Sequence, residues 1–134
     1  MGKMTYSALN QYKQNTVLTA TPEELTLMLY DGAIKFMNIA KYSIKNNDKE
    51  RAHKSLIRAQ DIVVELNSTL NMDYEVSKNL ETLYDFVIDK LIDANINKQG
   101  EPIDEALDIL TELRDTWKEA MKDVRKKVYQ NRQV

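Results

Sequence analysis

A helix that begins at Pro22 and runs to about Lys45 is the feature that most constrains how this chain folds. Thr21 is a residue type that often caps a helix N-terminus, and Glu24, three positions later, can complete a capping box with it. Pro22 falls at the first helical position, where its missing N–H leaves no hydrogen bond unmade. The start of this helix is therefore predicted from local chemistry alone.

This helix is apolar around most of its circumference. One stripe at helical spacing predicts the side that faces the core: Leu25, Met28, Leu29, Gly32, Phe36 and Ile39. Leu27, Ile34 and Met37 lie away from that stripe, and we expect a further neighbour or the N-terminal residues to cover them. A helix this apolar either lies at the centre of a bundle or packs on one side and binds a partner on the other.

Three further helices are predicted at about 48–70, 74–96 and 102–128. Two of them have apolar seams spaced alternately by three and four residues, which run Ala52, Leu56, Ala59, Val63, Leu66, Leu70 and Ile103, Ala106, Leu110, Leu113, Trp117, Ala120, Val124. Asn47 and Asp73 are the expected caps of the helices at 48–70 and 74–96. Only 3 Gly and 2 Pro interrupt the chain, and short links favour antiparallel neighbours. The predicted fold is all-α, an antiparallel up-down four-helix bundle with an N-terminal arm.

The 134 residues suit one domain with one core. We expect residues 1–20 to form the arm, residues 21–128 the bundle, and residues 129–134 a frayed C-terminal tail. Large apolar or aromatic side chains on the predicted core-facing sides of the four helices are the expected core anchors: Leu25, Leu29, Phe36, Leu66, Leu80 and Trp117.

Composition excludes several classes of function. The chain has no cysteine, so it has no disulfide or thiolate metal site, and this fits a reducing cytoplasm. The formal net charge of −2 argues against a nucleic-acid-binding surface. No apolar run approaches the ~20 residues that a membrane span needs, and the N-terminus lacks a signal-peptide core. We expect a cytoplasmic protein that binds no nucleic acid and does not insert into membranes.

The sequence holds one candidate for metal chemistry, the Glu50-x-x-His53 spacing found in carboxylate-bridged di-iron bundles. This is the only histidine, it lies off the Ala52–Leu56 seam, and no glutamate on another core stripe completes a site. No nucleophile triad or phosphate-binding loop is present. We therefore expect no catalytic residue, metal, cofactor or enzymatic activity.

Apolar residues that the core does not need are the remaining signal. Ile57 and Val64 lie off the seam of the second helix beside Gln60, and Ile62 lies off it on the other side. The arm could simply cover them, and isolated exposed apolar residues need no explanation. The functional interpretation is a groove that receives the apolar face of a partner helix, formed by Ile57, Gln60, Ile62 and Val64.

Five segments, in order, resemble the FliS family of flagellar secretion chaperones. They are A-L-N-Q-Y-K-Q-N (8–15), T-P-E-E-L-T-L-M-L-Y-D-G-A-I-K-F (21–36), R-A-Q-D-I-V-V-E-L (58–66), S-K-N-L-E-T-L-Y-D-F (77–86) and W-K-E-A-M (117–121). The first of them is similar to the N-terminal arm of that family, with its Tyr-x-Gln element at Tyr12 and Gln14.

The resemblance implies a four-helix chaperone of flagellin. The client would be the disordered C-terminal region of flagellin, which folds into helices as it wraps the bundle and is thereby kept from polymerising before export. The loaded chaperone would then dock on the flagellar type III export gate through the arm, for which Leu9, Tyr12 and Gln14 are the candidate contacts. Without client, the arm is expected to cover part of the groove, and an exposed groove also invites a homodimer. The alternative is a helical-bundle adaptor or regulator that binds another helical partner.

Overall fold

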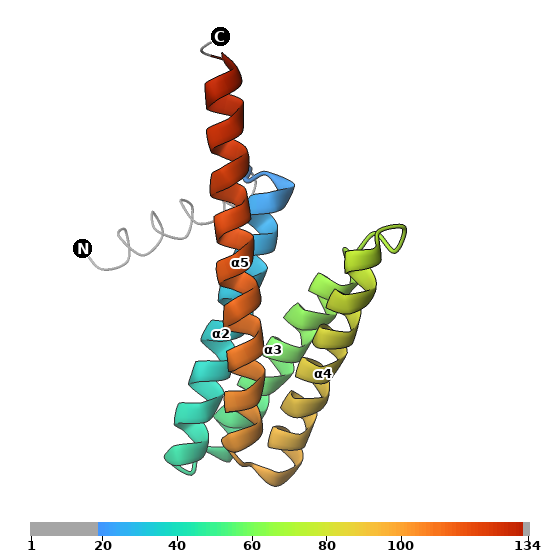
Figure 1. The fold of residues 1–134 in the computed structure, drawn as a ribbon. Coiled ribbons are helices and arrows are strands. Elements are labelled where there is room, and N and C mark those ends of the chain that lie inside the picture. Colours follow the sequence, from blue (N-terminus) through green and yellow to red (C-terminus); the bar gives the residue numbers. More distant parts are fainter. Residues whose placement is uncertain (1–18, 133–134) are drawn as a thin grey trace, which may run out of the picture.

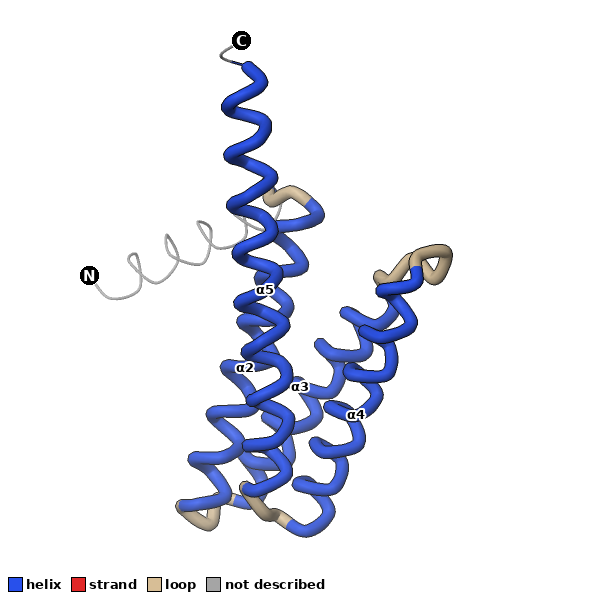
Figure 2. Tube along the Cα trace, in the orientation of Figure 1, coloured by secondary structure: helices blue, strands red, loops and turns tan. Residues whose placement is uncertain are grey.

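The fold is a four-helix bundle in which each helix runs antiparallel to the next (Figure 1). The computed structural model describes residues 19–132, and its helices are α2 (Pro22–Lys45), α3 (Lys49–Ser68), α4 (Glu75–Asn97) and α5 (Glu101–Arg132). Each helix packs on the next, and α5 returns to pack on α2. The links are short, at 46–48, 69–74 and 98–100 (Figure 2). The predicted all-α bundle is confirmed, whereas Leu9, Tyr12 and Gln14 of the arm lie outside the described residues.

The cap of α2 is as predicted, but the caps of α3 and α4 are not. Thr21 Oγ1 accepts the backbone N–H of Glu24 at 3.2 Å. At the start of α3, Asp48 rather than Asn47 is the N-cap, because Asn47 adopts φ 59° in the turn that separates the two helices. Asp73 likewise does not cap α4, whose N-cap is Tyr74 with no side-chain hydrogen bond; the Asp73 N–H instead bonds the Asn71 side chain at 3.0 Å. Both predictions were wrong because the backbone geometry of the preceding link, rather than the residue type, determines which residue is the N-cap.

The core-facing side of α2 differs from the predicted stripe. Its most buried apolar side chains are Tyr30, Ala33, Met37 and Ala40, none more than 3% exposed. Leu25 is 37% exposed, so the prediction that it anchors the core is wrong. Leu29 and Phe36 are only partly buried, at the edge of the core.

The shift follows from α2 having two neighbours. On one side, a Cβ on Gly32 would lie 3.4 Å from Ile62 Cδ1 of α3, and the Arg58 guanidinium lies 5.3 Å from the Phe36 ring. On the other side, Asp31 pairs with Arg114 of α5 at 3.0 Å. The stripe assigned to the core is therefore the flank against α3, and the true core face lies between the two flanks.

This arrangement explains two apolar residues of α2 that lie off the predicted stripe, Met37 and Ile34. Met37 was expected to need a further neighbour or the arm, yet it is 0% exposed at the centre of the core. Ile34 packs against the core beside α5, where Leu107 is also partly buried.

The other expected anchors lie in or against the core. Leu66 is 1% exposed, and Leu80 and Trp117 are partly buried against the core cluster. Trp117 Nε1 also donates to the Glu23 carbonyl oxygen at 3.0 Å, which ties α5 to the first turn of α2.

The helix α5 is longer than predicted and continues to Arg132, so residues 129–132 are helical rather than a frayed tail. It has 32 residues, against 24, 20 and 23 in α2, α3 and α4. Figure 1 shows its C-terminal end extending beyond the rest of the bundle. At the same end, the α2–α5 pair diverges from the α3–α4 pair.

A buried hydrogen bond joins the two pairs of helices. The hydroxyls of Tyr30 in α2 and Tyr84 in α4, 54 residues apart, bond each other, and the side chains are 3% and 2% exposed. Their rings lie 6.4 Å apart, centroid to centroid. Burial raises the pKa of both hydroxyls above their ordinary value of 10.0.

We expect Met37→Ala to destabilise the bundle by about 2–5 kcal/mol, because it opens a cavity at a fully buried position. The matched control is Leu25→Ala, which removes a side chain 37% exposed and should cost well under half as much. Chemical denaturation followed by circular dichroism measures both. Equal losses would mean that Leu25 belongs to the core after all.

We expect the tyrosine pair to make stability fall at alkaline pH. Because folding raises both pKa values, the contribution is fully present below pH 10 and is lost as the pH rises above it, where the unfolded chain ionises first. Replacing both by phenylalanine keeps the ring volume and removes the titration. The melting temperature of the double variant should therefore fall less than that of the natural chain between about pH 8 and about pH 11; parallel curves would contradict the assignment.

Candidate interaction surface

The Glu50-x-x-His53 spacing does not build a metal site. The Glu50 carboxylate pairs with Lys54 at 3.1 Å, and His53 Nδ1 is hydrogen-bonded to the Asn95 side-chain amide of α4 at 2.9 Å. Within residues 19–132, no three histidine or carboxylate side chains gather closely enough to hold a metal ion. None of the described helices is long and apolar enough to cross a membrane.

Three of the four predicted groove residues lie on the side of α3 that faces α4. Two side-chain hydrogen bonds mark this side: His53 with Asn95, and Asn67 Nδ2 with Asp85 Oδ1 at 3.4 Å. Ile57 is four residues after His53, and Val64 is three before Asn67, so both share that side of the helix. Their side chains are 38% and 53% exposed. Gln60 lies between them and is half-buried.

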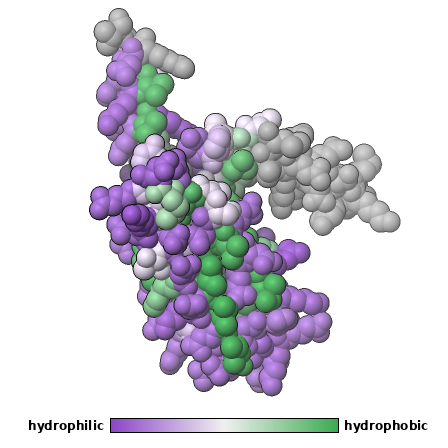
Figure 3. All heavy atoms as spheres, turned by 90° about the vertical axis from the view of Figure 1, so that its right-hand side faces the viewer, coloured by the Kyte–Doolittle hydropathy of each residue, from purple (hydrophilic) through white to green (hydrophobic). Residues whose placement is uncertain are grey.

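The helix α4 adds an apolar residue that the sequence prediction missed. Ile92 is three residues before Asn95 and seven after Asp85, which places it on the side that faces α3. It is 42% exposed. We call Ile57, Val64 and Ile92 the α3–α4 strip. Figure 3, which views the molecule from its α3–α4 side, shows an apolar stripe that runs along the bundle between hydrophilic side chains.

Ile62 does not join this strip. It is two residues before Val64, roughly 200° around the helix, and it packs near Gly32 of α2. The exposed Phe86 also does not belong to the strip, because it lies on the side of α4 that faces α5. There Lys90 lies 5.3 Å from its ring and pairs with Glu105 of α5 at 2.7 Å.

Carboxylates border the α3–α4 strip on both helices. Five exposed acidic residues occupy the outward positions beside it: Asp61 and Glu65 on α3, and Glu81, Asp85 and Asp89 on α4. Asp85 accepts from Asn67, an uncharged partner. Lys54, three residues before Ile57, and Lys78, three before Glu81, are exposed there as well. The edges of the strip are therefore mainly negative.

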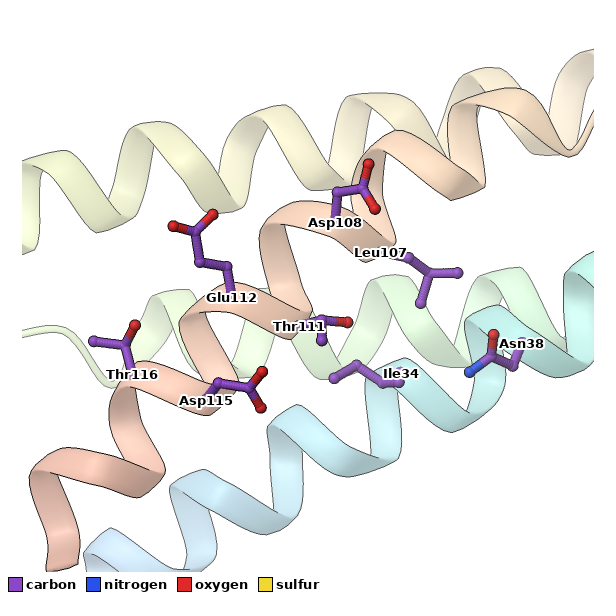
Figure 4. Close-up of a pocket in the computed structure, with 8 residues that line it drawn as sticks. All are labelled: Ile34, Asn38, Leu107, Asp108, Thr111, Glu112, Asp115 and Thr116. Atoms are coloured by element: carbon purple, nitrogen blue, oxygen red, sulfur yellow. The ribbon is translucent and has the colours of Figure 1, made fainter.

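A hollow lies between α2 and α5 and has a volume of about 480 Å³. Figure 4 shows Ile34 on the α2 side, while Asp108 and Glu112 point away from α2. Asp115 at its rim is already paired with Arg114 at 2.8 Å. Ile34 and Leu107 are partly buried against the core, whereas the three apolar residues of the strip are exposed.

Comparison with known proteins identifies the family. The family model described as flagellar protein FliS matches residues 5–124. The chain belongs to the FliS family. The resemblance seen in the sequence is therefore confirmed, and with it a role as a flagellar export chaperone.

Curated FliS relatives cover most of the chain. The flagellar secretion chaperone FliS of Bacillus subtilis strain 168 is 45% identical over 115 residues, which is 86% of each chain. The protein of the same name in Campylobacter jejuni is 33% identical over 84% of this chain and 89% of that one. The protein of the same name in Salmonella typhimurium is 29% identical over 86% of this chain and 90% of that one.

A solved structure supports the fold. A bacterial flagellar chaperone solved by crystallography superposes with a TM-score of 0.71, covering 89% of this chain and 98% of its own. At 21% identity, this likeness supports the four-helix fold described above and does not identify individual contacts.

Proposed function

We propose that this chain is a cytoplasmic chaperone that binds the disordered C-terminal region of flagellin, keeps it from polymerising, and delivers it to the flagellar type III export gate. The observation that carries the proposal is the α3–α4 strip in a member of the FliS family: three apolar side chains, 38–53% exposed, side by side on two packed helices. A chaperone for an assembly-competent helix needs such a surface, because the client must bury its own apolar face.

The spacing of the strip suits a helical client. Ile57 and Val64 are two helical turns apart, so they can contact residues i and i+7 of a helix that lies along them. Ile92, on the neighbouring helix α4, offers a third contact. An amphipathic client helix would bury its apolar stripe here and leave its polar side in water.

The strip is supported by a scaffold that does not depend on it. The fully buried core of α3, Ala52, Leu56, Ala59, Val63 and Leu66, includes no strip residue. The His53–Asn95 and Asn67–Asp85 bonds link α3 and α4 on either side of it. Client binding therefore needs little rearrangement of the bundle, and the ordering of the flexible client offsets part of the binding free energy. We therefore expect the affinity for the client to be useful but the binding to be reversible.

Delivery to the gate is proposed from the resemblance of residues 8–15 to the family arm. Leu9, Tyr12 and Gln14 are the proposed contacts, and they lie outside the described residues. An arm that competes for the client surface would lower apparent client affinity by the fraction of time it is docked.

We expect Ile57→Asp with Val64→Asp to weaken binding of the flagellin C-terminal segment by at least about 30-fold, since each buried aliphatic side chain contributes roughly 1–2 kcal/mol or more. Titration calorimetry with the cognate flagellin segment measures this. The helical circular dichroism should stay unchanged, because both residues are exposed.

The matched control for that double variant is Tyr42→Asp, which alters an exposed apolar residue of α2, 63% exposed and away from the strip. It should bind flagellin normally. Unchanged binding by the double variant would move the client site elsewhere on the bundle, and no binding by the natural chain would refute the proposed function.

We expect Tyr12→Ala to weaken docking of the loaded chaperone on the export gate more than it weakens client binding. A pull-down of the chaperone–flagellin complex with the cytoplasmic part of the gate, compared with calorimetry on flagellin alone, separates the two effects. If client affinity changes and gate docking does not, the arm acts only on the client surface.

A further inference from the structure

Within residues 19–132, the apolar side of the last turns of α5 has no helical neighbour. Trp117 and Arg125 make contacts with the first turn of α2, through the Glu23 carbonyl at 3.0 Å and the Glu24 carboxylate at 3.2 Å. From Lys118, α5 continues to Arg132, and its end extends away from the bundle (Figure 1). We call residues 118–132 the α5 extension.

The apolar seam of α5 continues into this extension. Ile103, Ala106 and Leu110 are 0% exposed within the bundle. Val128 follows Leu110 by 18 residues, five helical turns, so it lies on the same side, and Val124 lies close to that line. Yet Val124 is 61% exposed and Val128 is 46% exposed. The side that forms the core at one end of α5 is open at the other.

The α5 extension is strongly basic. It carries Lys118, Lys122, Arg125, Lys126 and Lys127 within ten residues, against only Glu119 and Asp123. All of these side chains are exposed. Two α5 extensions placed side by side would bring like charges together, which disfavours pairing of the seam with itself. The surface that fits is apolar with acidic edges.

The α3–α4 strip has these properties. Its apolar residues are bordered by Asp61, Glu65, Glu81, Asp85 and Asp89. The spacing also matches, because Met121 and Val128 are seven residues apart, as are Ile57 and Val64. The C-terminal end of α5 lies apart from α3 and α4 of the same molecule (Figure 1), so a second copy is the partner that we consider.

We propose that the α5 extension of one molecule docks on the α3–α4 strip of a second copy, with Lys118, Lys122, Lys126 and Lys127 beside the carboxylates of α3 and α4. The contact joins two different surfaces, so it is a head-to-tail interface, and repetition gives rings or short chains. One helix on one strip makes a small interface, so the association is weak and reversible. If the proposed function holds, this contact also covers the client surface while no client is bound.

The test is sedimentation velocity of the full-length chain and two exposed-residue variants, without flagellin. The extension variant is Val124→Asp with Val128→Asp, and the strip variant is Ile57→Asp with Val64→Asp. Up to about 0.5 mM, a range that reaches weak interfaces, the natural chain should associate and each variant alone should associate at least tenfold more weakly. Circular dichroism checks that both variants remain helical.

An equimolar mixture of the two variants is the decisive measurement. The extension variant retains an intact strip and the strip variant retains an intact extension, so the mixture should form a one-to-one complex that grows no further. Raising NaCl from about 50 mM to about 500 mM should weaken the complex, because salt screens the charged edges. A natural chain that stays monomeric, a strip variant that still self-associates, or a mixture that remains monomeric would each overturn the proposal. None of these results depends on whether flagellin is the client.

Discussion

The close packing of α2 against two neighbours is the constraint on which the rest of the structure depends. Small residues make it possible: Gly32 lies beside Ile62 of α3 with room for little more than a methyl group, and Ala33 and Ala40 are fully buried. Because α2 has α3 on one flank and α5 on the other, most of its wide apolar surface packs inside the bundle. Met37 then occupies the centre, and the Tyr30–Tyr84 hydrogen bond links α2 to α4 across it.

A core closed in this way leaves specific apolar side chains outside it. Ile57, Val64 and Ile92 are not needed to complete the packing of α3 and α4, and they remain 38–53% exposed between two side-chain hydrogen bonds. In a FliS-family chaperone, this division between a self-sufficient scaffold and an exposed strip makes physical sense. Under the proposed function, the scaffold would keep its stability when the client leaves, and the strip would keep its apolar surface available for the next one.

The length of α5 gives the molecule a second, oppositely charged surface. Its seam serves the core as far as Leu110 and Trp117 and then continues past the start of α2, where no helix within residues 19–132 covers it. The exposed Val124 and Val128 therefore have the same periodic origin as the buried Ile103 and Ala106. Acidic residues border the α3–α4 strip and basic residues line the α5 extension, so the two surfaces carry opposite charge although the net charge of the chain is only −2.

Local chemistry in the sequence determined the helices and the family. The Thr21 cap, the three-four seams of the second and fourth helices and the scarcity of glycine and proline predicted the bundle, since these signals act within a few residues along the chain. Tertiary structure alone decided which side of α2 is the core, that Leu25 is exposed while Met37 is buried, and that Ile92 rather than Ile62 accompanies Ile57 and Val64. Helical periodicity shows which side chains share a face, but the number and position of neighbouring helices determine where that face points.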